Sequence, residues 1–174
     1  AYDRGDMGTA IQYLEQARPG DPQNPVLLAT LGRAYLRNNQ IDLAISTLET
    51  AASLDGQNVE VLFDLGTLYY QEGRVDDAIE TFERASTIAP DDADILYNLG
   101  SAYAQTGNYD KGIELYNRAL QLNPRLAFAY FGLGTLYLQK GETAAAREAL
   151  NQFLTLIDDP DVRTRAQEML AELQ

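Results

Sequence analysis

Apolar residues in this chain return at helical intervals, most clearly over residues 59–92. Leu62, Leu65 and Tyr69 are spaced by three and four residues, which places them on one face of a helix. Gly73 then predicts the end of that helix, because glycine readily adopts the left-handed conformation of a helix terminus.

A second apolar stripe follows within the same segment and predicts a second helix. It includes Ala78, Phe82 and Ala85, and Pro90 predicts where that helix ends. Gly66 and Ala78 have almost no side chain, so the two helices can cross closely there. Phe82 is too large for a lone helix pair to cover, and the unit therefore needs neighbours.

These positions recur along the chain at a step of 34 residues. The glycine ladder is Gly32, Gly66, Gly100 and Gly134, and the tyrosine ladder is Tyr35, Tyr69, Tyr103 and Tyr137. The turn ladder is Gly5, Asn39, Gly73, Gly107 and Gly141. The small residues are Ala10, Ala44, Ala78, Gly112 and Ala146, and the bulky residues are Leu14, Leu48, Phe82, Tyr116 and Leu150.

With the closing Pro22, Pro90 and Pro124, this pattern resembles the tetratricopeptide repeat: L-G-x-x-Y, then A-x-x-x-F, then P. The usual tryptophan is absent. Its place is taken by Leu28, Leu62, Leu96 and Tyr130. The resemblance implies an all-α fold: a right-handed α-solenoid of antiparallel helix hairpins, closed by a C-terminal capping helix.

The period divides the chain into repeats. We expect the second helix of a partial repeat over 1–24, repeats over 25–58, 59–92 and 93–126, a divergent repeat over 127–160 and a capping helix over 161–174. Tyr2 lies one residue later than the step back from Tyr35 predicts. The chain also begins at Ala1, part-way through a repeat, which predicts that it is a piece of a longer protein.

The fourth full repeat diverges from the others. Arg147 stands where the other repeats have isoleucine, and Phe153 stands where they have alanine. The sequence Asp159-Pro160-Asp161 then has the features of a helix start. The following helix carries one apolar stripe, with Arg163 expected largely on its polar side. Its apolar residues are Val162, Ala166, Met169 and Leu170.

Composition narrows the range of functions. The 174 residues are 45% hydrophobic and carry a formal net charge of −13, so nucleic acid is an unfavourable partner. The sequence contains no run of about 20 apolar residues, so it does not predict a membrane-spanning helix. The compartment is left open, with a slight preference for the cytoplasm over an extracytoplasmic or membrane-anchored parent protein.

The chain has no histidine and no cysteine, which removes imidazole acid–base chemistry, thiolate nucleophiles and the usual zinc ligands. No phosphate-binding or nucleophile-elbow motif occurs. The remaining acidic clusters all fall at predicted helix starts, where capping explains them better than weak cation binding. They are Asp76 with Asp77; Asp91, Asp92 and Asp94; and Asp158, Asp159 and Asp161. We therefore expect no enzyme activity, no metal and no cofactor.

In tetratricopeptide proteins the exposed face of each first helix commonly holds a peptide in the concave groove. Here that face combines aromatic, hydroxyl and glutamine side chains. The aromatic row is Phe63, Tyr97 and Phe131, the hydroxyl row is Thr67, Ser101 and Thr135, and the glutamine row is Gln71, Gln105 and Gln139. Tyr70 and Phe128 add apolar surface. Phe63 and Tyr97 are expected in packing slightly more often than in ligand contact, and Phe128 and Phe131 are expected to be more available.

The first full repeat differs by carrying Arg33 and Arg37, which either bind a carboxylate or pair with acidic side chains of a neighbouring helix. Some family members clamp a peptide carboxylate with a stripe of lysine and asparagine. Asn98 matches one element of that clamp, but other stripe positions do not, so a clamp of that type is not expected. The mismatched positions are Ala29, Phe63, Phe128 and Gly132.

The leading hypothesis is a non-catalytic scaffold that binds a peptide or protein segment in the groove. Two alternatives remain open. One is a self-assembly module that associates through the incomplete N-terminal hairpin, and the other is a regulatory or anchoring part of a larger enzyme or membrane-bound protein.

Overall fold

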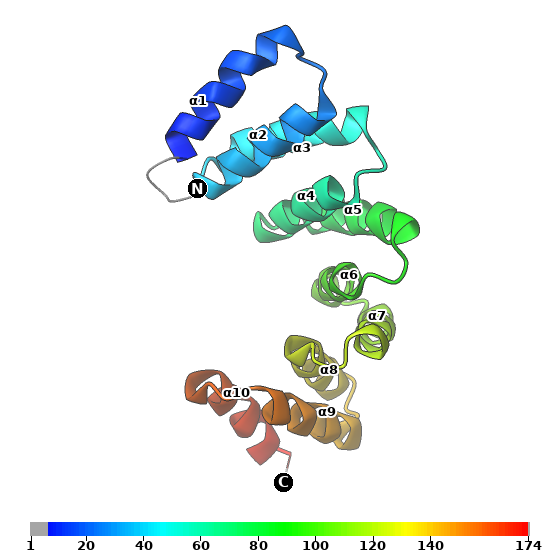
Figure 1. Ribbon diagram of the computed structural model, residues 1–174. Helices are drawn as coiled ribbons and strands as arrows, with labels where there is room; N and C mark the ends of the chain where they lie inside the picture. Colours follow the sequence, from blue (N-terminus) through cyan, green and yellow to red (C-terminus); the bar gives the residue numbers. More distant parts are fainter. Residues whose placement is uncertain (1–6, 174) are drawn as a thin grey trace. The chain divides into compact units, whose positions relative to one another are not determined.

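A computed structural model describes residues 7–173 of the chain. Over this range the elements are α-helices and one short 3-10 helix, without any strand (Figure 1). The predicted all-α solenoid of helix hairpins, with a further helix after the last hairpin, is confirmed. The predicted turn at Gly5 and the equivalence of Tyr2 lie outside the described residues. The chain divides into two compact units, residues 1–88 and 89–174.

Unit 1 contains a single helix followed by two hairpins. Its elements are α1 (Met7–Ala17), η1 (Arg18–Gly20), α2 (Pro25–Arg37), α3 (Ile41–Leu54), α4 (Val59–Gln71) and α5 (Val75–Ile88). The hairpins are α2 with α3 and α4 with α5; in addition α1 packs on α2, and α3 packs on α4. Each helix is therefore covered by its hairpin partner, by the adjacent hairpin, or by both.

Unit 2 contains two hairpins followed by one helix. Its elements are α6 (Ala93–Gln105), α7 (Tyr109–Leu122), α8 (Ala127–Gln139), α9 (Thr143–Leu156) and α10 (Pro160–Ala171). Here α6 pairs with α7 and α8 with α9, while α7 packs on α8 and α10 packs on α9.

The turn inside each hairpin has the backbone that the sequence predicts. Gly73, Gly107 and Gly141 have φ angles of 75°, 82° and 75°, and Asn39 has a φ of 59°. Asparagine is among the few residues other than glycine that tolerate this left-handed region. The departure from glycine at position 39 is therefore compatible with the same turn.

The glycine ladder lies at the crossing of the two helices of each hairpin. A Cβ atom at Gly66 would lie 2.8 Å from Cε1 of Phe82, and one at Gly32 would lie 2.6 Å from Cγ of Leu48. Both bulky partners are fully buried. A larger residue at either glycine would push the helices apart, because buried side chains are closely packed.

Two polar side chains, those of Asp159 and Arg163, hold the C-terminal helix α10 in place. The Asp159 carboxylate accepts hydrogen bonds from the backbone N–H groups of Asp161 and Val162 and so caps the helix. Arg163 is half-buried and donates to the carbonyl oxygens of Leu154 and Ile157, which end α9. Its expected place on the polar side was therefore wrong, because the last carbonyls of a helix need donors.

Arg147 and Phe153, the two residues of α9 that diverge from the other repeats, also help to hold α10 against α9. Nη2 of Arg147 donates to the carbonyl oxygen of Leu173 at 2.5 Å, which links α9 to the end of α10. Phe153 is fully buried in a cluster with Ala127, Leu150 and Ala166. The divergence of this repeat thus has a structural role: it joins the last hairpin to a single helix.

Candidate first-helix binding face

The predicted binding residues lie on the first helix of each hairpin. In unit 1, α2 carries Arg33 and Arg37, and α4 carries Phe63, Thr67, Tyr70 and Gln71. In unit 2, α6 carries Tyr97, Asn98, Ser101 and Gln105, and α8 carries Phe128, Phe131, Thr135 and Gln139.

The aromatic row packs against the second helices. The ring centroid of Phe63 lies 6.1 Å from that of Phe82, and Tyr97 lies 5.6 Å from Tyr116. Both Phe63 and Tyr97 are half-buried. Packing is thus one role of these two rings, and only part of each side chain is open to a ligand.

The aromatic residues of α8 differ from each other in exposure. Phe131 is half-buried, with its ring 5.2 Å from Phe153, so it is less available than expected. Phe128 lies 5.8 Å from Phe153 but keeps 53% of its surface exposed. Of the aromatic residues predicted for the binding face, Phe128 therefore offers the largest open surface.

The hydroxyl row is committed to its own helices. Thr67 donates to the carbonyl oxygen of Phe63 at 2.8 Å, Ser101 to that of Tyr97 at 3.0 Å, and Thr135 to that of Phe131 at 3.0 Å. This is the bond that Ser and Thr commonly form four residues back in a helix. These hydroxyls can therefore accept a hydrogen bond from a ligand but not donate one, a restriction that the sequence pattern did not reveal.

The glutamine row remains open. Gln71, Gln105 and Gln139 are each the last residue of their helix, and all three are exposed. Within the described part of the chain, their side-chain amides form no hydrogen bond. Each amide keeps two donor hydrogens and an acceptor oxygen available.

Two neighbouring residues are less available than these glutamines. The amide of Asn98 donates to the carbonyl oxygen of Asp94 at 2.8 Å. Tyr70 is half-buried, and burial raises the pKa of its phenol. Asn98 therefore has one amide hydrogen already used within its helix, and Tyr70 exposes only part of its side chain.

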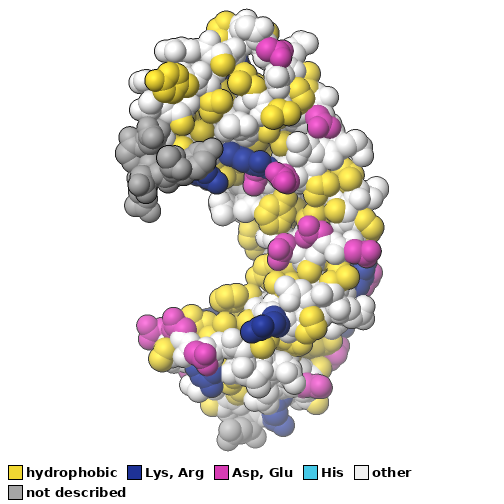
Figure 2. Space-filling view, in the orientation of Figure 1, with side chains coloured by type: hydrophobic (Ala, Val, Ile, Leu, Met, Phe, Trp, Pro, Cys, Tyr) yellow, Lys and Arg dark blue, Asp and Glu magenta, His cyan; other side chains and the backbone are white. Residues whose placement is uncertain are grey.

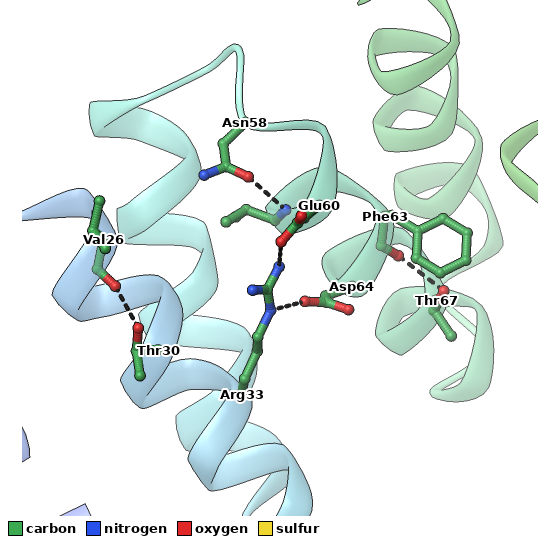
Figure 3. A network of polar contacts seen from close by, with 9 residues as sticks. Val26, Thr30, Arg33, Asn58, Glu60, Phe63, Asp64 and Thr67 are labelled. Atoms are coloured by element: carbon green, nitrogen blue, oxygen red, sulfur yellow. Dashed lines mark hydrogen bonds and ion pairs between the residues drawn. The ribbon is translucent and has the colours of Figure 1, made fainter. Parts of the chain in front are cut away.

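Arg33 joins α2 to α4 through two acidic side chains (Figure 3). Its Nε donates to Oδ2 of Asp64 at 2.5 Å, and its Nη2 donates to Oε2 of Glu60 at 2.9 Å. Burial alone would lower the pKa of Arg33, but the hydrogen bonds and charges of Asp64 and Glu60 outweigh it and raise the pKa. Of the two alternatives for this arginine, pairing with acidic side chains of a neighbouring helix is therefore the one that the structure shows for Arg33. The third nitrogen, Nη1, points away from both carboxylates (Figure 3).

A hollow of about 520 Å³ opens between α1 and α2, next to this pair. Its apolar surface comes from Met7, Ala10 and Leu14 of α1, together with Ala34 of α2, and its polar lining consists of Thr30, Arg33 and Arg37. Figure 2 shows Lys and Arg side chains of unit 1 lying directly beside Asp and Glu side chains. The pattern of rows did not predict this hollow, because it depends on how α1 meets α2.

The acidic clusters at helix starts act as caps or first-turn residues. Asp92 accepts hydrogen bonds from the backbone N–H groups of Asp94 and Ile95, and Asp76 and Asp77 lie in the first turn of α5. Over residues 7–173 there is no group of three acidic side chains arranged to hold a metal ion. In the same range, every helix is too short or too polar to cross a membrane.

The sequence reasoning missed a contact that reaches the binding face from behind. Tyr116, on the second helix α7, is buried and places its hydroxyl oxygen 3.0 Å from that of Ser101. A Cβ atom on Gly132 would lie 2.6 Å from Cε2 of the Tyr116 ring. Two positions of the sequence could have indicated this contact. Tyr116 is the only tyrosine in the bulky ladder, and Gly132 follows it sixteen residues later.

Three solved structures show the same fold. A crystal structure of MamA is 28% identical with a TM-score of 0.79, and the match covers 97% of this chain and 93% of that chain. MamA from Desulfovibrio magneticus RS-1 is 24% identical with a TM-score of 0.82, covering 88% and 86%. PilF from Pseudomonas aeruginosa is 21% identical with a TM-score of 0.78, covering 98% and 82%. The last two similarities concern the fold alone.

Family models match most of the sequence. Models described as tetratricopeptide repeat match residues 1–53 and 91–158, and one described as TPR repeat matches residues 66–107. Among curated proteins, none matches the chain. On the hairpins, the 34-residue ladders and these matches, the chain belongs to the tetratricopeptide repeat family.

Proposed function

We propose that this protein is a non-catalytic scaffold that binds a peptide or protein segment along the exposed faces of its first helices. The repeat family and the fold support an interaction scaffold. The proposed groove specifies what this scaffold binds. Its ligand is a peptide segment with an apolar side chain and with backbone N–H and C=O groups free to form hydrogen bonds.

The observation that carries the proposal is the row of exposed glutamines. Gln105 and Gln139 present uncommitted amides at one position of the two first helices of unit 2, and Gln71 presents one at the same position of α4 in unit 1. A peptide backbone has one donor and one acceptor per residue, which matches the capacity of an amide side chain. A repeated neutral amide therefore suits a backbone better than a charged ligand.

The hydroxyl row narrows the contacts further. Since Thr67, Ser101 and Thr135 already donate to their own helices, they can contribute only acceptor oxygens. A bound segment must meet them with N–H or O–H groups. The backbone N–H groups of a peptide satisfy this requirement, and a carboxylate does not.

The exposed ring of Phe128 supplies the apolar part of the binding face in unit 2. It is 53% exposed and rests on the buried Phe153, so a ligand can bury the remaining surface without rearranging the core. Aromatic side chains often dominate binding energy because they bury a large area with few rotatable bonds.

The test uses a phage-displayed library of random twelve-residue peptides, selected on the wild-type protein. The affinity of the selected peptides is then measured by fluorescence anisotropy. Substituting both Phe128→Ala and Gln105→Ala should weaken binding at least ~10-fold, as expected for the loss of an anchoring ring and an amide.

Leu122→Ala is the matched control. Leu122 is 44% exposed and lies at the end of α7, a second helix of the same unit. Its loss should leave the affinity unchanged. If the Phe128 and Gln105 double variant keeps both its circular dichroism spectrum and its affinity, the groove model is wrong.

A further inference from the structure

The first turns of α6, α8 and α10 differ in charge at one edge of the proposed binding face in unit 2. Asp94 of α6 and Phe128 of α8 stand 34 residues apart, at one position of the repeat. The first turn of α8 has no acidic residue, whereas that of α10 contains Asp161. The start of α8 thus presents an exposed ring where α6 presents a carboxylate.

Asp94 and Asp161 flank this ring. Because α6 contacts α8 directly and the axes of packed helices are about 8–10 Å apart, Asp94 lies one helix spacing from Phe128. On the other side, Val162 of α10 packs against the cluster that contains Phe153, and the ring of Phe128 lies 5.8 Å from Phe153. Asp161 directly precedes Val162 in the chain. A side chain bound on Phe128 is therefore within reach of a carboxylate on either side.

The carboxylates of Asp94 and Asp161 are exposed and form no ion pair within residues 7–173. Hydrogen-bonded capping of the two helices is supplied by other residues, Asp92 in α6 and Asp159 in α10. The helix dipole favours a carboxylate in the first turn, but it occupies none of the carboxylate oxygens. The oxygens of Asp94 and Asp161 therefore remain available to a cationic group.

The two ends of the binding face differ in charge. The starts of α6 and α10 carry three aspartates each, against Arg125 in the loop before α8. At the opposite end the face closes with the neutral Gln105 and Gln139, and Lys140 is paired there with two carboxylates. A ligand that lies along this face therefore meets a negative potential beside Phe128 and neutral amides at the other end.

The stripe between these two ends sets the length of the bound segment. Phe128, Gly132, Thr135 and Gln139 follow one another at steps of four, three and four residues, which keeps them on one side of α8. The helix rises roughly 16 Å from Phe128 to Gln139, a distance that an extended chain covers in about five residues. No residue of α8 is charged, so the charge requirement comes only from its neighbours.

We infer, on the basis of the scaffold function proposed above, that the segment bound by unit 2 carries a lysine or arginine next to the apolar residue that contacts Phe128. The cationic group pairs with Asp94 on one side of the ring or with Asp161 on the other. About five further residues run along α8 to Gln139, whose amide bonds their backbone. A segment with an acidic residue beside its apolar anchor is rejected, because that residue would face like charges on both sides.

The probes are the twelve-residue peptides selected from the phage-displayed library on the wild-type protein. We expect lysine or arginine beside the apolar anchor of these peptides, and few acidic residues there. Replacing that base by glutamate should weaken binding at least ~10-fold at low salt, and the difference should shrink in about 0.5 M NaCl, where exposed charges are screened. A glutamate placed at the far end of the same peptide should change the affinity less than ~3-fold.

A double variant of the protein tests the two carboxylates. Asp94→Asn combined with Asp161→Asn removes both charges and keeps the size of the side chains. The lysine and glutamate forms of each peptide should then bind with affinities within ~3-fold of each other. Glu114→Gln combined with Glu148→Gln is the matched control, because both residues are exposed on the second helices α7 and α9 and the net charge changes by the same amount. This control should keep the full preference for the lysine form.

Several results would overturn the inference. One is a set of selected peptides without an excess of basic over acidic residues beside the anchor. Another is an Asp94 and Asp161 double variant that keeps its circular dichroism spectrum and the wild-type preference. Loss of the preference in the Glu114 and Glu148 control would assign it to the net charge of the chain instead.

These outcomes are separate from failure of the scaffold function itself. Peptides that ignore charge but lose affinity when Phe128 and Gln105 are both replaced by alanine would refute the charge requirement and leave the groove in place. A library that yields no peptide dependent on those two residues would refute both.

Discussion

The Tyr116 hydroxyl reaches from α7 to within 3.0 Å of the Ser101 hydroxyl on α6. Since Ser101 donates to the carbonyl oxygen of Tyr97, it accepts from Tyr116. The ring also occupies the space that a side chain on Gly132 would need. One buried tyrosine thus links α6, α7 and α8 and lies directly behind the proposed binding face of unit 2.

This relationship predicts a strong coupling between Gly132 and Tyr116. Gly132→Ala should lower the free energy of unfolding by about 1–3 kcal/mol, because its Cβ would overlap a rigid buried ring. Leucine stands at the position of Tyr116 in three of the other repeats, and Tyr116→Leu should remove most of that cost when combined with Gly132→Ala. Urea unfolding followed by circular dichroism measures both effects. Gly8→Ala is the control, since an added Cβ there meets nothing within 4 Å. Additive costs in the double variant would contradict the packing described.

The turn at Asn39 predicts a stabilising substitution. Asn39 has a φ of 59°, and glycine stands at the equivalent turn in the later hairpins. Asn39→Gly should raise the free energy of unfolding by less than ~1 kcal/mol, because glycine adopts a positive φ without steric strain. Asn39→Val should cost about 1–2 kcal/mol, since a β-branched residue is strained at positive φ. Equal melting temperatures for Asn39→Val and the wild type would show that the turn is not left-handed.

The contact between α1 and α2 predicts a loss of stability at high pH. Burial and the hydrogen bond that Tyr35 donates to Glu15 raise the pKa of Tyr35 from 10.0 to about 12. Between these values the unfolded chain loses the phenol proton while the folded chain keeps it. The free energy of unfolding therefore falls as the pH rises from 10 towards 12, and below pH 10 this contribution is fully present.

Tyr35→Phe is the comparison variant for this pH dependence. It should be less stable than the wild type at pH 9 and should show a shallower fall above pH 10, in urea unfolding at each pH. Tyr69, whose pKa burial and Glu49 also raise, remains in both proteins as an internal reference. Parallel pH profiles for the two proteins would rule out Tyr35 as the titrating group.

The half-buried guanidinium of Arg163 is one of the contacts that hold the C-terminal helix. Arg163→Met keeps the length of the side chain but leaves the carbonyl groups of Leu154 and Ile157 without their donor. We expect a loss of about 1–3 kcal/mol and faster proteolysis within α10. Arg165→Met is the matched control on the same helix, because Arg165 is exposed. Proteolysis at equal rates in the two variants would show that Arg163 does not hold the helix.

The sequence by itself determined the helices, the turns and the hairpin period. These are local or repeated requirements: a left-handed residue at Asn39 and Gly73, and a missing side chain where Gly66 meets Phe82. Each is visible in sequence because the same packing problem recurs every 34 residues. The membership of the aromatic, hydroxyl and glutamine rows followed from the same period.

Only the tertiary structure decided which of those rows remain available. The hydroxyls of Thr67 and Thr135 are used by their own helices, and Phe131 is covered where α8 meets α9 and α10. Arg163 proved to be a half-buried donor to the end of α9, although its position within the helix pattern is polar. The exposure of Phe131 and the hydrogen bonds of Arg163 depend on which neighbouring helix lies against each side chain. That neighbour is set by contacts between elements far apart in the chain, which no local pattern records.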